Sequence, residues 1–293
     1  MSSQTDRLYI GVGGIAAGAL GRSGVNNRDS VFTYNPGIAD EDAVSLTMPV
    51  RLESYNWEFG IHPLFEMHLP EGHLKNELMR RFSKSVRGFD DFALLGIVGP
   101  YQLGRISIAH SPDDESLPEI KLSELLVHDG AEDLFDNLMK TYAAYSGVSG
   151  VQPKVLVRDA GDQAADIGRI THRGATHLLK TFNGEDFPQL AANEFFCMRA
   201  ALHAGLAVPE FQLSRQGKLL VVKRFDVSDK GYLGFEDMCV LSGWGTGKKY
   251  DGSYQGCARQ IQSYVTPSRV TKALEDFFMM VALCAGIQNG DGH

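Results

Sequence analysis

The alternation of apolar and polar residues in the first third of the chain predicts short strands and one helix. Apolar residues form short runs between turn residues over 8–14, 29–37, 45–50 and 104–108, a pattern typical of β-strands. From Gly72 to Phe82, charged side chains interleave with apolar ones at helical spacing. This part of the chain is therefore expected to be rich in β-structure.

The remainder of the chain predicts longer helices mixed with strands. Helices are expected over 122–145, 189–204 and 267–287, and strands over 177–182 and 219–225. Between the two parts, a polar and acidic stretch with two prolines is typical of a linker. We predict an α+β fold with a β-rich N-terminal subdomain at 1–110, a linker at 111–120 and a second domain at 121–293.

Composition and charge exclude several classes of protein. Of the 293 residues, 43% are apolar and 22% are charged, as in a soluble globular protein. The longest apolar run, 277–285, is too short to span a bilayer, and the four cysteines are scattered without metal-ligand spacing. A cytoplasmic protein is expected. A net charge of −8 argues against direct binding of nucleic acid, which needs clustered Lys and Arg.

Two glycine-rich segments are candidates for binding phosphate. The first contains Gly11, Gly13, Gly14 and Gly18, whose spacing departs from the dinucleotide fingerprint, so a hairpin turn is the favoured interpretation. In the second, 146–154, small residues would let backbone N–H groups approach a polyphosphate. The alternative there is a surface turn between a helix and a strand.

Charged residues follow several of the predicted strands and helices. Lys180 ends an apolar strand and could neutralise phosphate charge, and Glu194 on the next helix could pair with it. The strand at 221–226 could present backbone groups to an adenine ring, and Asp291, between two glycines, could face a substrate hydroxyl. Read one at a time, these residues could equally be solvated charges, a strand end and a turn.

Taken together, these segments resemble the HipA family of bacterial serine/threonine kinase toxins. The resemblance covers nearly the whole chain, and its specificity lies in the order and spacing of the segments. The segments that carry it are 45–49, 69–72, 89–95, 149–154, 177–180, 193–194, 223–226, 236–239, 249–250 and 289–293. The resemblance implies a protein-kinase-like fold whose α-helical C-terminal part is largely missing from these 293 residues.

The resemblance also implies a binding site for ATP and Mg²⁺. The residues it places at ATP are Ser149, Gly150, Val151, Gln152, Lys154, Lys180, Lys223 and Phe225. Lys180 would bind the α- and β-phosphates, with Glu194 as its partner, and the strand at 223–225 would contact adenine through its backbone. Asp291 would orient or deprotonate the substrate hydroxyl. Phosphorylation of Ser149 by the kinase itself would be inhibitory, because the added phosphate competes with ATP for the loop.

Partners follow from the same resemblance. The substrate would be an aminoacyl-tRNA synthetase, whose phosphorylation halts translation. A small helix-turn-helix antitoxin resembling HipB would bind the toxin and connect it indirectly to DNA. The family's Mg²⁺-binding residues are expected beyond His293, so we expect the 293-residue chain to coordinate Mg²⁺ poorly. The alternative is a catalytically inactive remnant that binds the antitoxin or ATP without transferring phosphate.

Overall fold

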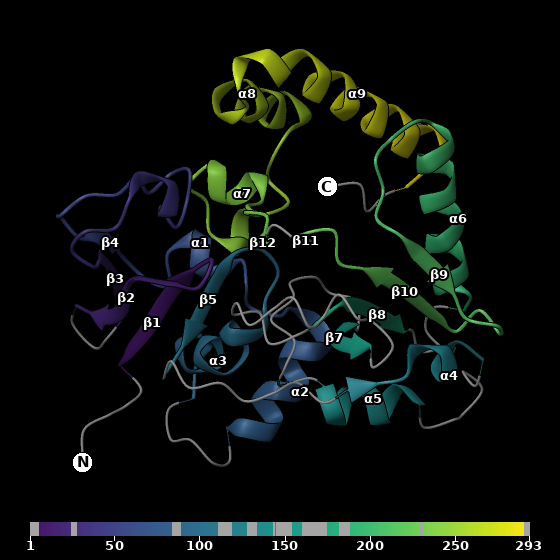
Figure 1. Ribbon diagram of the computed structural model, residues 1–293, viewed down its shortest axis with the longest axis horizontal. Helices are drawn as coiled ribbons and strands as arrows, with labels where there is room; N and C mark the ends of the chain where they lie inside the picture. Colours follow the sequence, from purple (N-terminus) through teal and green to yellow (C-terminus); the bar gives the residue numbers. More distant parts are fainter. Residues whose placement is uncertain are drawn as a thin grey trace.

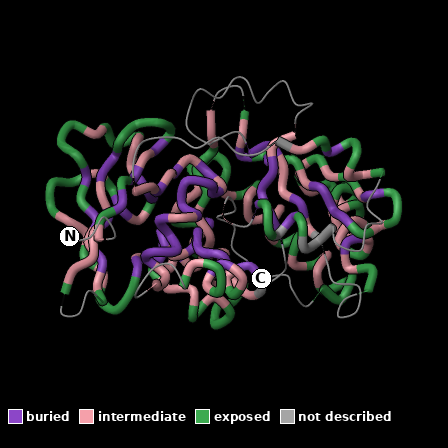
Figure 2. The backbone as a smooth tube through the Cα atoms, turned by 90° about the horizontal axis from the view of Figure 1, so that it is seen from below, coloured by how far each residue is buried: buried purple, intermediate pink, exposed green. Residues whose placement is uncertain are grey.

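The computed structural model describes residues 6–24, 28–83, 89–110, 119–127, 134–142, 144, 154–159, 175–181, 188–228 and 231–289. These residues form two five-stranded sheets, a small two-stranded hairpin and helices packed around them (Figure 1). We call residues 6–110, which contain the first sheet, the N-terminal half. Residues 119–289, which contain the second sheet, are the C-terminal half. Figure 2 shows buried segments in both halves.

The first sheet is antiparallel throughout, with the order β4-β3-β2-β1-β5. Its strands are β1 (Arg7–Val12), β2 (Ile15–Ser23), β3 (Asp29–Tyr34), β4 (Tyr55–Trp57) and β5 (Ile106–Ala109). Along β1, Leu8, Ile10 and Val12 are buried while the residues between them face outward. This alternation is the reason the sequence predicts a strand here, because successive side chains point to opposite faces.

The early glycines shape this sheet. Gly13 and Gly14 form the turn between β1 and β2 and have φ values of 55° and 91°. Both values lie in the region that favours glycine, as a two-residue hairpin turn requires. A Cβ atom on Gly18 would lie 2.4 Å from the Thr33 carbonyl oxygen on the neighbouring strand. The hairpin interpretation is therefore confirmed.

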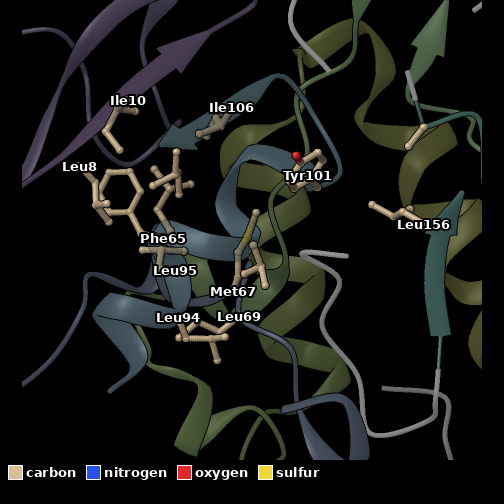
Figure 3. Packing of buried hydrophobic residues seen from close by; sticks show 14 of the residues in the cluster. Leu8, Ile10, Phe65, Met67, Leu69, Leu94, Leu95, Tyr101, Ile106 and Leu156 are labelled. Carbon is tan, nitrogen blue, oxygen red and sulfur yellow. The ribbon is translucent and has the colours of Figure 1, made fainter. Parts of the chain in front are cut away.

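Three helices belong to the N-terminal half: α1 (Pro63–Glu66), α2 (Gly72–Phe82) and α3 (Asp91–Val98), of which α3 packs against β5. Helix α2 has the bounds that the sequence predicts. In Figure 3, Leu8 of β1 and Leu95 of α3 lie toward Phe65 of α1, and Leu156 stands apart on a strand of the second sheet. The buried apolar cluster is continuous, and it joins Leu78 of α2 to Leu156. Helix α2 contacts both halves, because Lys75 pairs with Asp91 of α3 and Arg81 donates to the carbonyl oxygen of Lys140 in the C-terminal half.

The strand predicted over 45–50 is wrong. This segment contains only an isolated bridge between Ser45 and Met48. The backbone N–H of Thr47 donates to the Ser45 hydroxyl, and that of Leu46 donates to the side chain of Glu236. Pro49 has no N–H to donate. Local side-chain hydrogen bonds and the proline thus take the place of a strand ladder.

The second sheet has the order β6-β7-β8-β10-β9, and only the pair β6 and β7 is parallel. Its strands are β6 (Glu119–Ile120), β7 (Lys154–Asp159), β8 (His177–Thr181), β9 (Phe211–Leu213) and β10 (Leu219–Lys223). Helix α6 (Leu190–His203) packs against β9 and β10, and α5 (Leu134–Tyr142) packs against β7. Helix α4 (Leu122–Val127) precedes α5. The predicted helix over 122–145 is thus described as two helices, and residues 128–133 between them lie outside the described residues.

The chain continues into three more helices, the first of which contacts α1 of the N-terminal half. They are α7 (Met238–Leu241), α8 (Tyr254–Tyr264) and α9 (Val270–Gly286), and the last two pack together along the upper edge of Figure 1. The helix predicted over 267–287 begins with a 3-10 turn, Pro267–Arg269, before α9. No helix in the described parts of the chain has the length and apolarity needed to cross a membrane.

A buried ion pair connects the N-terminal and C-terminal halves. Arg224 and Asp226 lie between β10 and the small hairpin of β11 (Val227–Ser228) and β12 (Gly231–Tyr232), with side chains 2% and 3% exposed. Asp226 Oδ2 accepts a hydrogen bond from the backbone N–H of Gly104 at 2.7 Å, and Arg224 Nη2 donates to the carbonyl oxygen of Gln102 at 3.3 Å. The pair therefore links the second sheet to the loop before β5.

Candidate functional site

Two lysines lie side by side on neighbouring strands of the second sheet. Lys154 on β7 and Lys180 on β8 are partners in the antiparallel register. Residues directly opposite each other in such a pair project to the same face of the sheet. Lys154 is 9% exposed and the side chain of Lys180 is 18% exposed. Two ammonium groups therefore share one face with little access to water.

Helix α6 supplies a carboxylate to these lysines. Glu194 lies in the second turn of the helix, and its Oε1 accepts a hydrogen bond from Lys180 Nζ. The ion pair expected between Lys180 and Glu194 is thus present, with the Glu194 side chain 23% exposed. Glu194 Oε2 is buried and has no hydrogen-bond partner among the described residues. The pair is held by two rigid elements, a central strand and a long helix, which fixes the position of Lys180.

Burial and neighbouring charges lower the pKa of Lys154 to about 8. Desolvation is the largest cause, because removal from water disfavours the charged ammonium. The positive charges of Lys180 and Lys249 lower the pKa further, while Glu194 and Glu71 raise it. A lysine with a pKa this close to neutrality, beside a second lysine, is typical of a functional site.

A second lysine–glutamate pair adjoins the first. Lys249 Nζ donates to Glu71 Oε1 at 3.1 Å, and the two side chains are 25% and 21% exposed. Glu71 is the N-cap residue of α2 and belongs to the N-terminal half. Both charges act on Lys154. The site therefore gathers three ammonium groups and two carboxylates from β7, β8, α6, the start of α2 and the segment after α7.

At the end of the predicted adenine-binding strand, side chains alternate between exposed and buried positions. Lys223 points outward and lies 3.5 Å from Glu210, and Phe225 is 60% exposed, whereas Arg224 and Asp226 point inward. The backbone N–H of Lys223 donates to the Glu210 carbonyl oxygen at 2.8 Å, and that of Arg224 donates to Thr176 at 2.9 Å. An adenine contact at this strand would therefore use other backbone groups, and the adenine-binding role stays a prediction.

Several predicted site residues lie outside the described part of the chain. They are Ser149, Gly150, Val151, Gln152 and Asp291. Their roles stay predictions, as do the domain boundaries at 110 and 121. Within the residues that the structure describes, no group of three or more His, Cys, Asp or Glu side chains is placed to hold a metal ion.

Glu71, Lys249, Arg224 and Asp226 lie in segments that carry the family resemblance, but the sequence predicted no ion pair for any of them. For Arg224 and Asp226 a signal exists, since residues two apart in an extended segment share a face, and opposite charges there can pair. For Glu71 and Lys249 no local signal exists. They are 178 positions apart, and only the packing of the two halves brings them together.

The fold and the site define a mixed helix-and-sheet protein with paired lysines and glutamates at one face of its second sheet. The family model of the HipA N-terminal domain matches residues 8–109, and that of the HipA-like C-terminal domain matches residues 146–293. The chain belongs to the HipA family.

A curated relative and a solved structure extend this finding. The chain is 23% identical over 288 residues to the Sinorhizobium fredii protein named "Putative kinase Y4dM", covering 90% of this chain and 66% of that protein. It is similar in fold to HipA of Shewanella oneidensis MR-1, from a complex with HipB and operator DNA, with a TM-score of 0.64 and 19% identity. That match covers 97% of this chain and 70% of the other. The predicted α+β, HipA-like fold with a β-rich N-terminal part is confirmed.

Proposed function

We propose that this chain binds ATP and acts as a protein serine/threonine kinase, the toxin of a bacterial type II toxin-antitoxin system. The observation that carries the proposal is the ion pair between Lys180 and Glu194, with Lys154 beside it on the neighbouring strand. Ammonium groups are suitable donors to phosphate oxygens, and a lysine fixed by a glutamate is the arrangement that protein kinases use to hold ATP. Membership of the HipA family supports the same function.

Each residue of the proposed site would have its own role. Lys180 would contact the α- and β-phosphates while Glu194 holds its position, and Lys154 would add a second positive charge. Asp291 would orient the substrate hydroxyl, and Ser149 would be the site of inhibitory autophosphorylation. Chemistry of this class depends on positioning and neutralisation of charge, to which bound Mg²⁺ contributes.

Partners form the second part of the proposal. A HipB-like helix-turn-helix antitoxin would bind the chain, as HipB accompanies the structurally similar HipA of Shewanella oneidensis. With a net charge of −8, the chain would meet DNA through the antitoxin and not directly. The phosphorylated protein would be an aminoacyl-tRNA synthetase in the cytoplasm.

The first test is ATP binding by the 293-residue chain, measured by isothermal titration calorimetry. We expect Lys180→Met and Glu194→Gln each to weaken ATP binding at least about tenfold, since each removes a charge-assisted contact or its support. Lys272→Met is the matched control, because Lys272 also pairs with an acid, Asp276, but on the exposed face of α9. Failure of the wild-type chain to bind ATP, or equal losses in all three variants, would refute the proposed site.

The second test is transfer of labelled phosphate from ATP. A chain that binds ATP in a Lys180-dependent manner and transfers phosphate supports the kinase. A chain that binds ATP and the antitoxin without any transfer is instead a binding module, which is the alternative that the sequence leaves open. Asp291→Asn should abolish transfer and leave antitoxin binding unchanged.

A further inference from the structure

The ion pair between Glu71 and Lys249 connects the N-terminal half to the proposed phosphate site. Lys249 follows a 3-10 turn, Thr246–Lys248, that lies against the N-terminal half. The side chain of Glu66 accepts two hydrogen bonds from Thr246, at 2.8 Å from its backbone N–H and at 2.9 Å from its hydroxyl. Two carboxylates of the N-terminal half therefore set the position of Lys249. Glu71 pairs with Lys249 itself, and Glu66 binds Thr246 in the turn before it.

A third carboxylate fixes the beginning of the same segment. Glu236 accepts hydrogen bonds from the Ser45 hydroxyl at 2.7 Å and from the backbone N–H of Leu46 at 2.8 Å. The segment from Glu236 to Lys249 is thus attached to the N-terminal half near both ends. A lysine at the end of such an anchored segment loses little further freedom when it binds a ligand, which favours binding.

The charge of Lys249 acts on the lysine pair of the second sheet. Lys154 and Lys180 lie opposite each other in the sheet register, and the charges of Lys180 and Lys249 both disfavour the charged form of Lys154. Glu71 and Glu194 supply two negative charges in return. The side chains of Lys249 and Glu71 are about one quarter exposed, so a ligand can reach them from solvent.

We propose that Lys249 is a third phosphate-binding lysine of this site, and that Glu71 is a positioning residue that holds it there. The ligand class is the polyphosphate of a nucleoside di- or triphosphate. This inference rests on the proposed binding of ATP and extends it, because it makes the N-terminal half a contributor to the nucleotide site. Glu71 would serve Lys249 as Glu194 serves Lys180.

The test compares ATP with adenosine as ligands of the 293-residue chain in calorimetry. Lys249→Met should weaken ATP binding at least about tenfold and leave adenosine binding unchanged, because only ATP carries phosphates. Glu71→Gln should produce a smaller loss with the same selectivity. Glu71 makes no side-chain capping bond to α2, so this variant keeps the start of the helix. The double variant should bind ATP as Lys249→Met does, because Glu71 acts through Lys249.

Glu66→Gln is the matched control. It weakens an anchor on the same surface but removes no lysine partner, so it should lower the affinities for ATP and adenosine together or not at all. Unchanged ATP affinity in Lys249→Met, tighter ATP binding in Glu71→Gln, or additive losses in the double variant would each overturn the inference. Lys180→Met separates the two proposals: if it weakens ATP binding and Lys249→Met does not, ATP binding stands and the role of Lys249 falls.

Discussion

The buried ion pair between Arg224 and Asp226 yields the sharpest prediction about stability. The perturbation is Asp226→Asn, which preserves the shape of the side chain and removes its charge. Asp226 accepts hydrogen bonds from Arg224 Nε at 3.0 Å, from Arg224 Nη2 at 2.5 Å and from the backbone N–H of Gly104 at 2.7 Å. An asparagine side chain cannot satisfy all three donors and turns its own N–H groups toward the guanidinium.

The expected loss follows from burial. Both side chains are no more than 3% exposed, so Arg224 would remain charged and uncompensated in the interior. Breaking a buried pair in this way costs about 3–5 kcal/mol. The pKa of Asp226 is lowered from 3.8, as a stabilised carboxylate requires. Burial alone would raise this pKa, but the hydrogen bonds and charge of Arg224, together with the hydrogen bond from the Gly104 N–H, outweigh burial. The difference between wild type and variant should therefore be complete above about pH 4 and disappear as the pH falls below the pKa of the folded state.

The assay is urea unfolding followed by tryptophan fluorescence. Trp57 reports on the first sheet and Trp244 on the segment after α7, so the two halves are both observed. At a slope of about 3 kcal/mol per molar urea, the expected loss moves the midpoint by about 1–2 M. Asp276→Asn, which breaks the exposed pair with Lys272 on α9, should cost only about 0.5 kcal/mol or less.

A loss below about 1 kcal/mol in Asp226→Asn would refute the reasoning, because it would mean that Arg224 finds water or another partner. The double variant Arg224→Met, Asp226→Leu gives a second check. Replacing both charges by apolar side chains of similar size leaves no uncompensated ion, so stability should recover part of the loss. The rest of the loss remains because the buried N–H of Gly104 and the carbonyl oxygen of Gln102 lose these hydrogen bonds. If the double variant is as unstable as the single one, the damage lies in the packing between the halves and not in the charge.

Two further predictions concern pH. Burial lowers the pKa of His62 to about 4, below the ordinary 6.5, so the unfolded state takes up a proton before the folded state does. Between pH 6.5 and 4, the free energy of unfolding of the wild type should fall by up to about 3 kcal/mol relative to that of His62→Asn. The Asn side chain can still cap α1 but does not titrate. Equal pH slopes of wild type and variant in urea titrations would contradict this prediction. The pKa of Lys154, near 8, predicts that ATP affinity falls about tenfold between pH 7 and 9 as the lysine loses its proton. Calorimetry on Lys154→Arg should show no such fall, and an identical fall would assign it to another group.

Much of the candidate site could be expected from the sequence, because local patterns carry it. Lys180 ends an apolar strand and Glu194 lies on the following helix, so a strand and a helix packed together would bring the two charges into contact. The structure offers fewer free groups for the adenine contact that the sequence predicts at 223–225. The inward side chains of this strand, Arg224 and Asp226, serve the contact between the halves, and two of its backbone donors already have acceptors.

The sequence by itself determined the elements whose signal is local. Helix α2 follows from helical spacing, and the β1–β2 hairpin follows from glycines at its turn, because each depends on residues close together along the chain. The failed strand at 45–50 shows the limit, since Leu46 donates to Glu236, 190 positions away. The pair of Glu71 with Lys249 was likewise decided only by tertiary structure. Contacts between distant residues depend on how the two halves pack, and no local periodicity records that packing.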